Sequence, residues 1–144
     1  MKFPFTASIA LIALSAPAFA EGDAAKGERE FNKCKACHMI QADDGTDIVR
    51  GGRTGPNLYG IVGDAAGTQD GFRYGSGLEA AAEQGLVWDA DNLVAYIQDP
   101  RAFLVEFTGD SSVRSNMSFK LARGAEDVVA YLASVGPAEG ETAD

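Results

Sequence analysis

The two cysteines and the only histidine of this 144-residue chain all lie in one short stretch, CKACH at residues 34–38. Three kinds of site use these residues at close spacing: a zinc knuckle, a pair of thiols, and a covalently attached haem. In the last of these, Cys34 and Cys37 form thioethers with the two haem vinyl groups. His38 then lies under the iron as an axial ligand.

The rest of the chain weakens the first two kinds of site. A structural zinc site needs four ligands, usually from two separated pairs, and the chain has no further cysteine or histidine. A redox dithiol follows a strand in a βαβ pattern, whereas this pair ends a predicted helix. A plain disulfide stays open for an exported protein. The complete Cys-x-x-Cys-His pattern favours covalent haem c.

A second axial ligand can be sought among the three methionines. Met1 belongs to a predicted leader, and Met39, next to His38, is on the wrong side of the ring. Met117 remains, in the polar stretch SNMSFKL, although a methionine more often packs in a core. Ligation by His38 and Met117 leaves iron no open position, which is typical of an electron carrier.

The first twenty residues predict a secretory signal peptide, cleaved after Ala20. Lys2 provides a basic start, an apolar alanine-rich run follows, and Ala18 and Ala20 occupy the −3 and −1 positions. A retained membrane anchor is the alternative, but the run is short for a span. The mature chain, 21–144, is expected to form one periplasmic domain. Without Lys2 it carries 11 basic and 21 acidic side chains, a net charge of −10 that disfavours nucleic-acid binding.

The pattern after the leader predicts short helices and long loops. Asp23 can cap a first helix that runs into Cys34, and residues 41–77 contain ten glycines and are expected to be extended loop. The later elements are expected to be a helix at 78–84, a helix from Asp89 to Pro100, a short turn at 101–106, a helix at 125–135, and a frayed tail from Ala138. So much loop packs poorly on itself, which predicts a large apolar cofactor in the middle.

Five stretches, in this order, carry a resemblance to a known family: FNKCKACH, RTGPNLYGIVG, GFRYGSGL, GLVWDADNLVAYIQDPRAFL and NMSFKL. From about Asp23 to Val135 the chain resembles a class I cytochrome c of the large bacterial cytochrome c-two type. The resemblance implies an all-α fold, with short helices and long loops around one covalently bound haem. It also implies that the first helix crosses the last, where Gly27 and Phe31 meet Tyr131.

The resemblance assigns roles to four further residues. Pro56 is similar to the proline whose carbonyl accepts a hydrogen bond from the histidine ligand, and Tyr96 to the tyrosine that hydrogen-bonds the methionine sulfur. Tyr74 and Trp88 resemble the pair that donates to a haem propionate. For these three aromatic residues, ordinary core packing is the alternative. The residues expected to line the haem pocket are Leu58, Leu93, Ile97 and Phe119.

The chain departs from the family pattern in its charges. Asp64 stands where many members have a basic residue near a propionate, so it either faces solvent or the propionate is held differently. Few lysines are available for docking, but the segments around His38 and Met117 are locally basic. They are either solvated faces or a weakly basic rim for an acidic partner.

These features predict a soluble, monomeric, single-haem carrier without enzymatic activity or a membrane anchor. Its partners would be membrane complexes of photosynthetic or respiratory chains, with a bc1-type donor and a reaction centre or oxidase as acceptor, or periplasmic reductases. A haem c gas sensor or peroxidase-like protein with a labile sixth ligand is the main alternative. A dedicated partner of one dehydrogenase is a lesser one.

Overall fold

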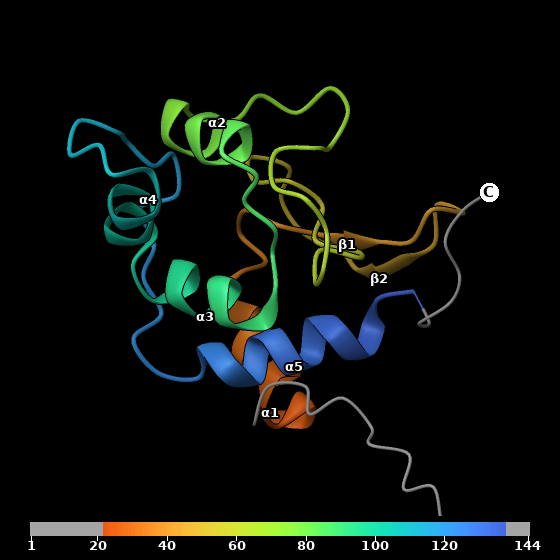
Figure 1. Cartoon of the computed structure of the whole chain (residues 1–144). Coiled ribbons are helices and arrows are strands. Elements are labelled where there is room, and N and C mark those ends of the chain that lie inside the picture. The colour runs from red at the N-terminus through yellow and green to blue at the C-terminus, as the bar shows by residue number, and fades with distance from the viewer. Residues whose placement is uncertain (1–21, 138–144) are drawn as a thin grey trace, which may run out of the picture.

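The computed structural model describes residues 22–137; the predicted leader and the predicted tail from Ala138 lie outside this range. Most regular structure in the described chain is helical, in agreement with the predicted all-α fold, and there is one small sheet (Figure 1). None of its helices is long and apolar enough to cross a bilayer. The elements are α1 (Ala24–Glu30), a 3-10 turn η1 (Phe31–Lys33), β1 (Ile40–Gln41), β2 (Asp47–Val49), α2 (Ser76–Glu83), α3 (Ala90–Gln98), α4 (Pro100–Thr108) and α5 (Ala125–Val135).

Helices α1 and α5 come first and last among the helices of the described chain, and they pack against each other (Figure 1). Gly27 permits their close approach, because a Cβ there would lie 1.9 Å from the Asp127 carbonyl oxygen and 2.8 Å from Tyr131 Cβ. The Phe31 and Tyr131 rings meet at 5.8 Å between centroids. The predicted crossing is therefore confirmed, and so are the Asp23 cap, which accepts from Lys26 N, and the bounds of α5.

The short turn predicted at 101–106 is wrong, because this segment belongs to the nine-residue helix α4. Pro100 was expected only to stop the preceding helix, which it does. It also occupies the first turn of α4, where proline is favoured because no backbone N–H is needed there. The Asp99 side chain accepts from Ala102 N, and Gly109, with φ of 72°, ends the helix.

The glycine-rich segment is not wholly irregular, contrary to expectation. It contains an antiparallel pairing of β1 with β2, whose tip is closed by Thr46 N donating to Asp44 Oδ1 at 2.9 Å. A register irregularity interrupts this pairing, and strands so short leave no periodic signal. Helix α2 also begins earlier than predicted, at Ser76 and not at Leu78.

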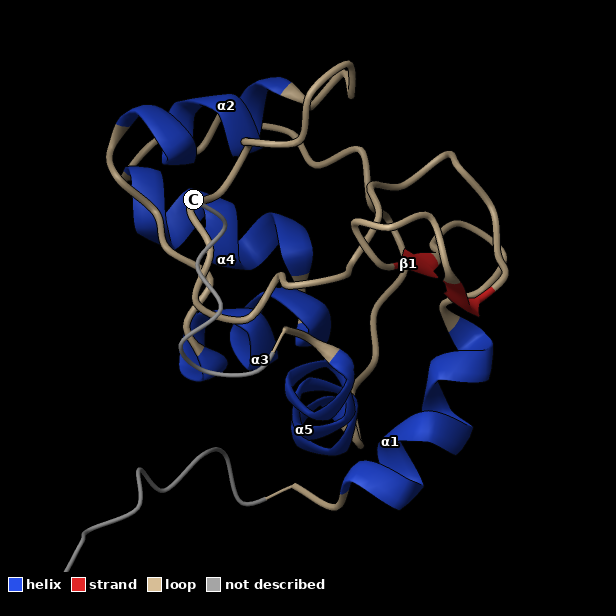
Figure 2. Ribbon diagram, turned by 90° about the vertical axis from the view of Figure 1, so that its right-hand side faces the viewer, coloured by secondary structure: helices blue, strands red, loops and turns tan. Residues whose placement is uncertain are grey.

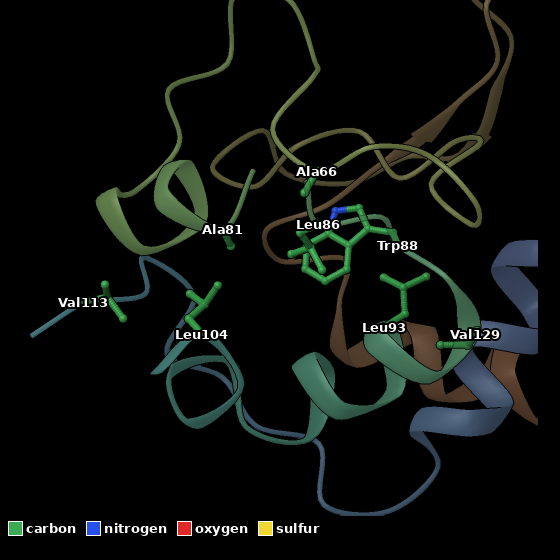
Figure 3. Packing of buried hydrophobic residues seen from close by; sticks show 8 residues of the cluster. All are labelled: Ala66, Ala81, Leu86, Trp88, Leu93, Leu104, Val113 and Val129. Atoms are coloured by element: carbon green, nitrogen blue, oxygen red, sulfur yellow. The ribbon is translucent and has the colours of Figure 1, made fainter. Parts of the chain in front are cut away.

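The helices form an arc in which α2 packs on α4, α4 on α3, α3 on α5 and α5 on α1 (Figure 2). Two groups of buried side chains accompany this arc. The first follows α2, α3 and α4 and includes Trp88, Leu93 and Leu104 (Figure 3). The second lies where α1 meets α5 and includes Phe31, Ile40 and Leu121. The core is thus divided into two groups, and Ile61, Val62 and Ile97 pack against both.

Candidate functional site

The CKACH stretch forms a tight turn directly after η1. Both Cys37 N and His38 N donate to the Cys34 carbonyl, at 3.1 and 2.9 Å. Cys34 is half-buried, Cys37 is exposed, and both are free thiols. Burial raises the pKa of the Cys34 thiol to about 11. A reactive redox dithiol has a lowered thiol pKa, so this environment argues against that alternative.

His38 is held in one tautomer by a neighbouring loop. Its Nδ1 lies 2.8 Å from the Pro56 carbonyl oxygen, as the family resemblance implied. A carbonyl can only accept, so Nδ1 carries the proton and donates, which leaves the Nε2 lone pair for a metal. Burial lowers the pKa of His38, although the hydrogen bond to Pro56 opposes this effect. The imidazole is therefore neutral at pH 7, the form that binds iron.

A glycine-containing strap, residues 51–56, packs on this turn. Gly52 N donates to Lys35 O and Gly55 N donates to Cys37 O, both at 2.8 Å. A Cβ at Gly55 would lie 2.3 Å from His38 Cε1, so only glycine leaves room for the ring. The sequence prediction missed this role of Gly55. Its position immediately before Pro56, in RTGPN, was the available signal.

Met117 lies half-buried in a second loop, the methionine segment, which we define as residues 113–121. Backbone hydrogen bonds fix both ends: Gly77 N donates to Arg114 O at 3.1 Å, and Leu121 N donates to Ile97 O at 3.0 Å. Met39 instead lies on the His38 side, where its carbonyl accepts from Leu58 N at 3.0 Å. The choice of Met117 over Met39 as an iron ligand remains a prediction.

Tyr96 is linked to the methionine segment through Ser115. The Ser115 hydroxyl donates to the Met117 carbonyl at 2.8 Å, and its side chain also lies within reach of the Tyr96 hydroxyl. Burial raises the pKa of Tyr96, and the neighbouring Ser115 side chain partly offsets the rise. Ser115 was missed in the sequence, where one hydroxyl among several polar residues gives no signal.

The remaining predicted residues lie in different surroundings. Trp88 is buried, with its ring 4.9 Å from that of Tyr96 between centroids, and the Tyr74 hydroxyl accepts from Gln69 N at 3.1 Å. Asp64 is exposed, so of the two expectations the solvent-facing one is met; its carboxylate accepts from Ala65 N at 2.8 Å. Of the expected pocket residues, Leu93 is buried, Leu58 and Ile97 pack against the core, and Phe119 is 43% exposed.

Comparisons with known proteins place this site in a family, although no family model matches the chain. Cytochrome c-550 of Paracoccus versutus is 53% identical over 99% of this chain and 95% of its own length. Cytochrome c2 of Rhodobacter capsulatus is 54% identical over 94% of this chain and 98% of its own length. The X-ray structure of ferric cytochrome c-550 from Paracoccus versutus matches with a TM-score of 0.79 at 57% identity, covering 81% of this chain and all of that one. The chain therefore belongs to the family of bacterial cytochromes c-550 and c2, with the class I cytochrome c fold and the haem c attachment spacing at Cys34 and Cys37.

Proposed function

We propose that this protein is a periplasmic electron carrier whose single haem c is held by Cys34 and Cys37, with His38 and Met117 as the iron ligands. The observation that carries the proposal is the 2.8 Å contact between His38 Nδ1 and the Pro56 carbonyl. It keeps Nε2 unprotonated beside two free thiols. When bound, the haem supplies a one-electron redox couple.

The chain's own residues position and shield this couple. Pro56 orients His38, and its hydrogen bond raises the basicity of the imidazole. Ser115 holds the backbone at Met117 through its hydrogen bond to the Met117 carbonyl. With His38 and Met117 both bound to the iron, small molecules would find no open site on it. The protein is therefore proposed to catalyse no substrate chemistry of its own.

The absorption spectrum of the oxidised holoprotein tests this ligation. A weak far-red band from methionine–iron coordination should be present in the wild type and absent in Met117→Ala. Met39→Ala is the matched control and should retain the band, because Met39 lies on the His38 side. A high-spin spectrum in the wild type would contradict the proposal and favour a sensor or peroxidase-like protein with a labile sixth ligand.

We also propose that the carrier docks an acidic partner through basic residues near the two ligand-bearing segments. Lys33 pairs with Glu30, and Lys120 pairs with Asp99, so these lysines are partly neutralised. Lys35, Arg114 and Arg123 are exposed and form no ion pair within residues 22–137. The chemistry suits membrane redox complexes, with a bc1-type donor and a reaction centre or oxidase as acceptor, or periplasmic reductases.

The salt dependence of electron-transfer kinetics tests this docking surface. The association rate with such a partner should fall as ionic strength rises, because salt screens the attraction. Arg114→Gln should reduce both the rate and its salt dependence. A rate that increases with salt would instead indicate docking through the acidic face.

A further inference from the structure

Asp99 is both the C-cap of α3 and the N-cap of α4, a position that no other described carboxylate shares. One oxygen, Oδ1, accepts from Ala102 N at 3.1 Å. The other, Oδ2, accepts from Lys120 Nζ at 2.7 Å. The carboxylate therefore fixes the start of a helix with one oxygen and reaches the methionine segment with the other.

This ion pair lies where the methionine segment rejoins the helices. Lys120 is three residues beyond Met117, and the next residue, Leu121, is buried and donates its N–H to Ile97 O near the end of α3. Between Ser115 and Leu121 the residues are half-buried or exposed. Their position is thus set by the two ends, by Ser115 and by the pair with Asp99.

The carboxylate of Asp23 provides an internal comparison, because it makes only local contacts; the long-range bond of this residue, to Asp127 Oδ1 at 2.7 Å, is donated by its backbone N–H, which Asp23→Asn retains. Its carboxylate accepts from Lys26 N at 3.1 Å and pairs with Lys26 Nζ at 3.5 Å, within one turn of α1. The pair of Asp99 with Lys120 joins residues 21 positions apart. Breaking the first pair affects one helix end, whereas breaking the second releases a loop from a helix.

We propose that Asp99 is a positioning residue, which holds the methionine segment closed through Lys120 and so slows replacement of Met117 by other iron ligands. The proposal rests on His38/Met117 ligation. Asp99 has no contact with iron in this scheme. Opening of the segment must separate Lys120 from Asp99, so the ion pair stabilises the closed state relative to the open one.

Exchange of Met117 for imidazole in the oxidised holoprotein tests the role of Asp99. The exchange is followed as loss of the far-red band, at a pH where imidazole is mostly uncharged. Asp99→Asn removes the charge but keeps an N-cap, since asparagine caps as well as aspartate. We expect exchange about two- to fivefold faster than in the wild type, the range that one exposed ion pair supplies. Asp23→Asn should exchange at the wild-type rate.

Two further measurements separate this role from a general loss of stability. Lys120→Gln should accelerate exchange as much as Asp99→Asn, and the double variant should exchange no faster than either single one. Raising the salt concentration should accelerate wild-type exchange but leave Asp99→Asn unchanged, because imidazole is neutral and only the ion pair is screened. Denaturant unfolding should show similar losses for Asp99→Asn and Asp23→Asn.

The outcomes separate this inference from the proposed function. A wild-type protein without the far-red band would contradict His38/Met117 ligation itself. A wild type with the band, in which Asp99→Asn exchanges at the rate of Asp23→Asn, would leave the ligation standing and overturn the role of Asp99. Additive effects of Asp99→Asn and Lys120→Gln would also overturn it.

Discussion

His38 and Met117 lie on segments that are held in place in different ways. Around His38, the strap of residues 51–56 donates backbone hydrogen bonds to Lys35 and Cys37, and the ring itself donates to Pro56. Around Met117, the backbone bonds lie at the ends of the segment, and side chains hold the middle: the Ser115 hydroxyl and the exposed pair of Lys120 with Asp99.

The difference indicates where the site opens first. The backbone hydrogen bonds between the strap and the CKACH turn can be broken only by separating these two segments of main chain. Side-chain contacts at the surface can be lost by local opening, which leaves the rest of the fold intact. We therefore expect the histidine side to be the more rigid half of the site and, under the proposed ligation, exchange of the iron ligand to begin on the methionine side.

Gly27→Ala should give the largest loss of stability, because α1 carries the CKACH turn and its contact with α5 leaves no room for a Cβ. The added carbon would lie 1.9 Å from the Asp127 carbonyl oxygen, so the helices must separate. We expect a loss of about 1–3 kcal/mol in the free energy of unfolding, the usual cost of overpacking, measured with denaturant.

Gly136→Ala is the matched control for this substitution. Its Cβ would meet nothing closer than 3.4 Å, and its φ of −71° suits alanine. The two variants should therefore differ clearly in unfolding midpoint. Equal midpoints would show that α1 can move on α5, and the histidine side would not be rigid.

Gly55→Ala should have the next largest effect and should act on the ligand directly. The new Cβ would lie 2.3 Å from His38 Cε1, so either the ring turns away from Pro56 or the strap shifts. We expect a loss of about 1–2 kcal/mol in the free energy of unfolding and a changed haem spectrum. An unchanged spectrum would mean that the strap yields easily, and the contrast between the two sides would fail.

Attachment of haem c could be predicted from the sequence, because CKACH is a local pattern with one dominant meaning. Met117, reached by elimination among three methionines, remains a prediction. The residues that support the site were harder to predict. Gly55 and Ser115 were missed because their roles depend on contacts made after folding. A hydroxyl that donates to a nearby carbonyl has no periodicity or spacing that marks it, and the only mark of Gly55 was its place before Pro56.

The fold shows the same division. Capping residues and periodicity predicted α3 and α5 well, because Asp89 and Gly136 mark their ends. Helix α4 was missed because Pro100 was interpreted as a stop, although proline also starts helices. Strands β1 and β2 were missed because elements of two and three residues carry no pattern and depend on pairing across a turn.

Ser115→Ala should have a moderate effect, limited to the methionine side. It removes a half-buried hydroxyl that donates to Met117 O at 2.8 Å, a contact of the kind that contributes about 0.5–1.5 kcal/mol. Imidazole exchange should be faster than in the wild type. Ser134→Ala removes a similar bond, to Tyr131 O at 2.7 Å, and should leave exchange unchanged. Equal exchange rates in the two variants would place the opening elsewhere.

Acid titration of Asp99 and Asp23 should give the smallest effect. Lys120 and the Ala102 N–H hold the pKa of Asp99 below its usual value of 3.8, and the Lys26 N–H lowers that of Asp23. A carboxylate with a lowered pKa in the folded protein stabilises it above the unfolded pKa, and the benefit is lost as pH falls through the folded pKa. The midpoint difference between wild type and Asp99→Asn should thus be constant from pH 7 to about 5 and shrink below about 4. Asp23→Asn should behave alike, since global unfolding senses each carboxylate whatever segment it joins. If the midpoint difference shrank at low pH for only one of the two variants, the carboxylates of Asp99 and Asp23 would not be equivalent caps. A difference in imidazole exchange rate between Asp99→Asn and Asp23→Asn could then no longer be attributed to the link with Lys120 alone.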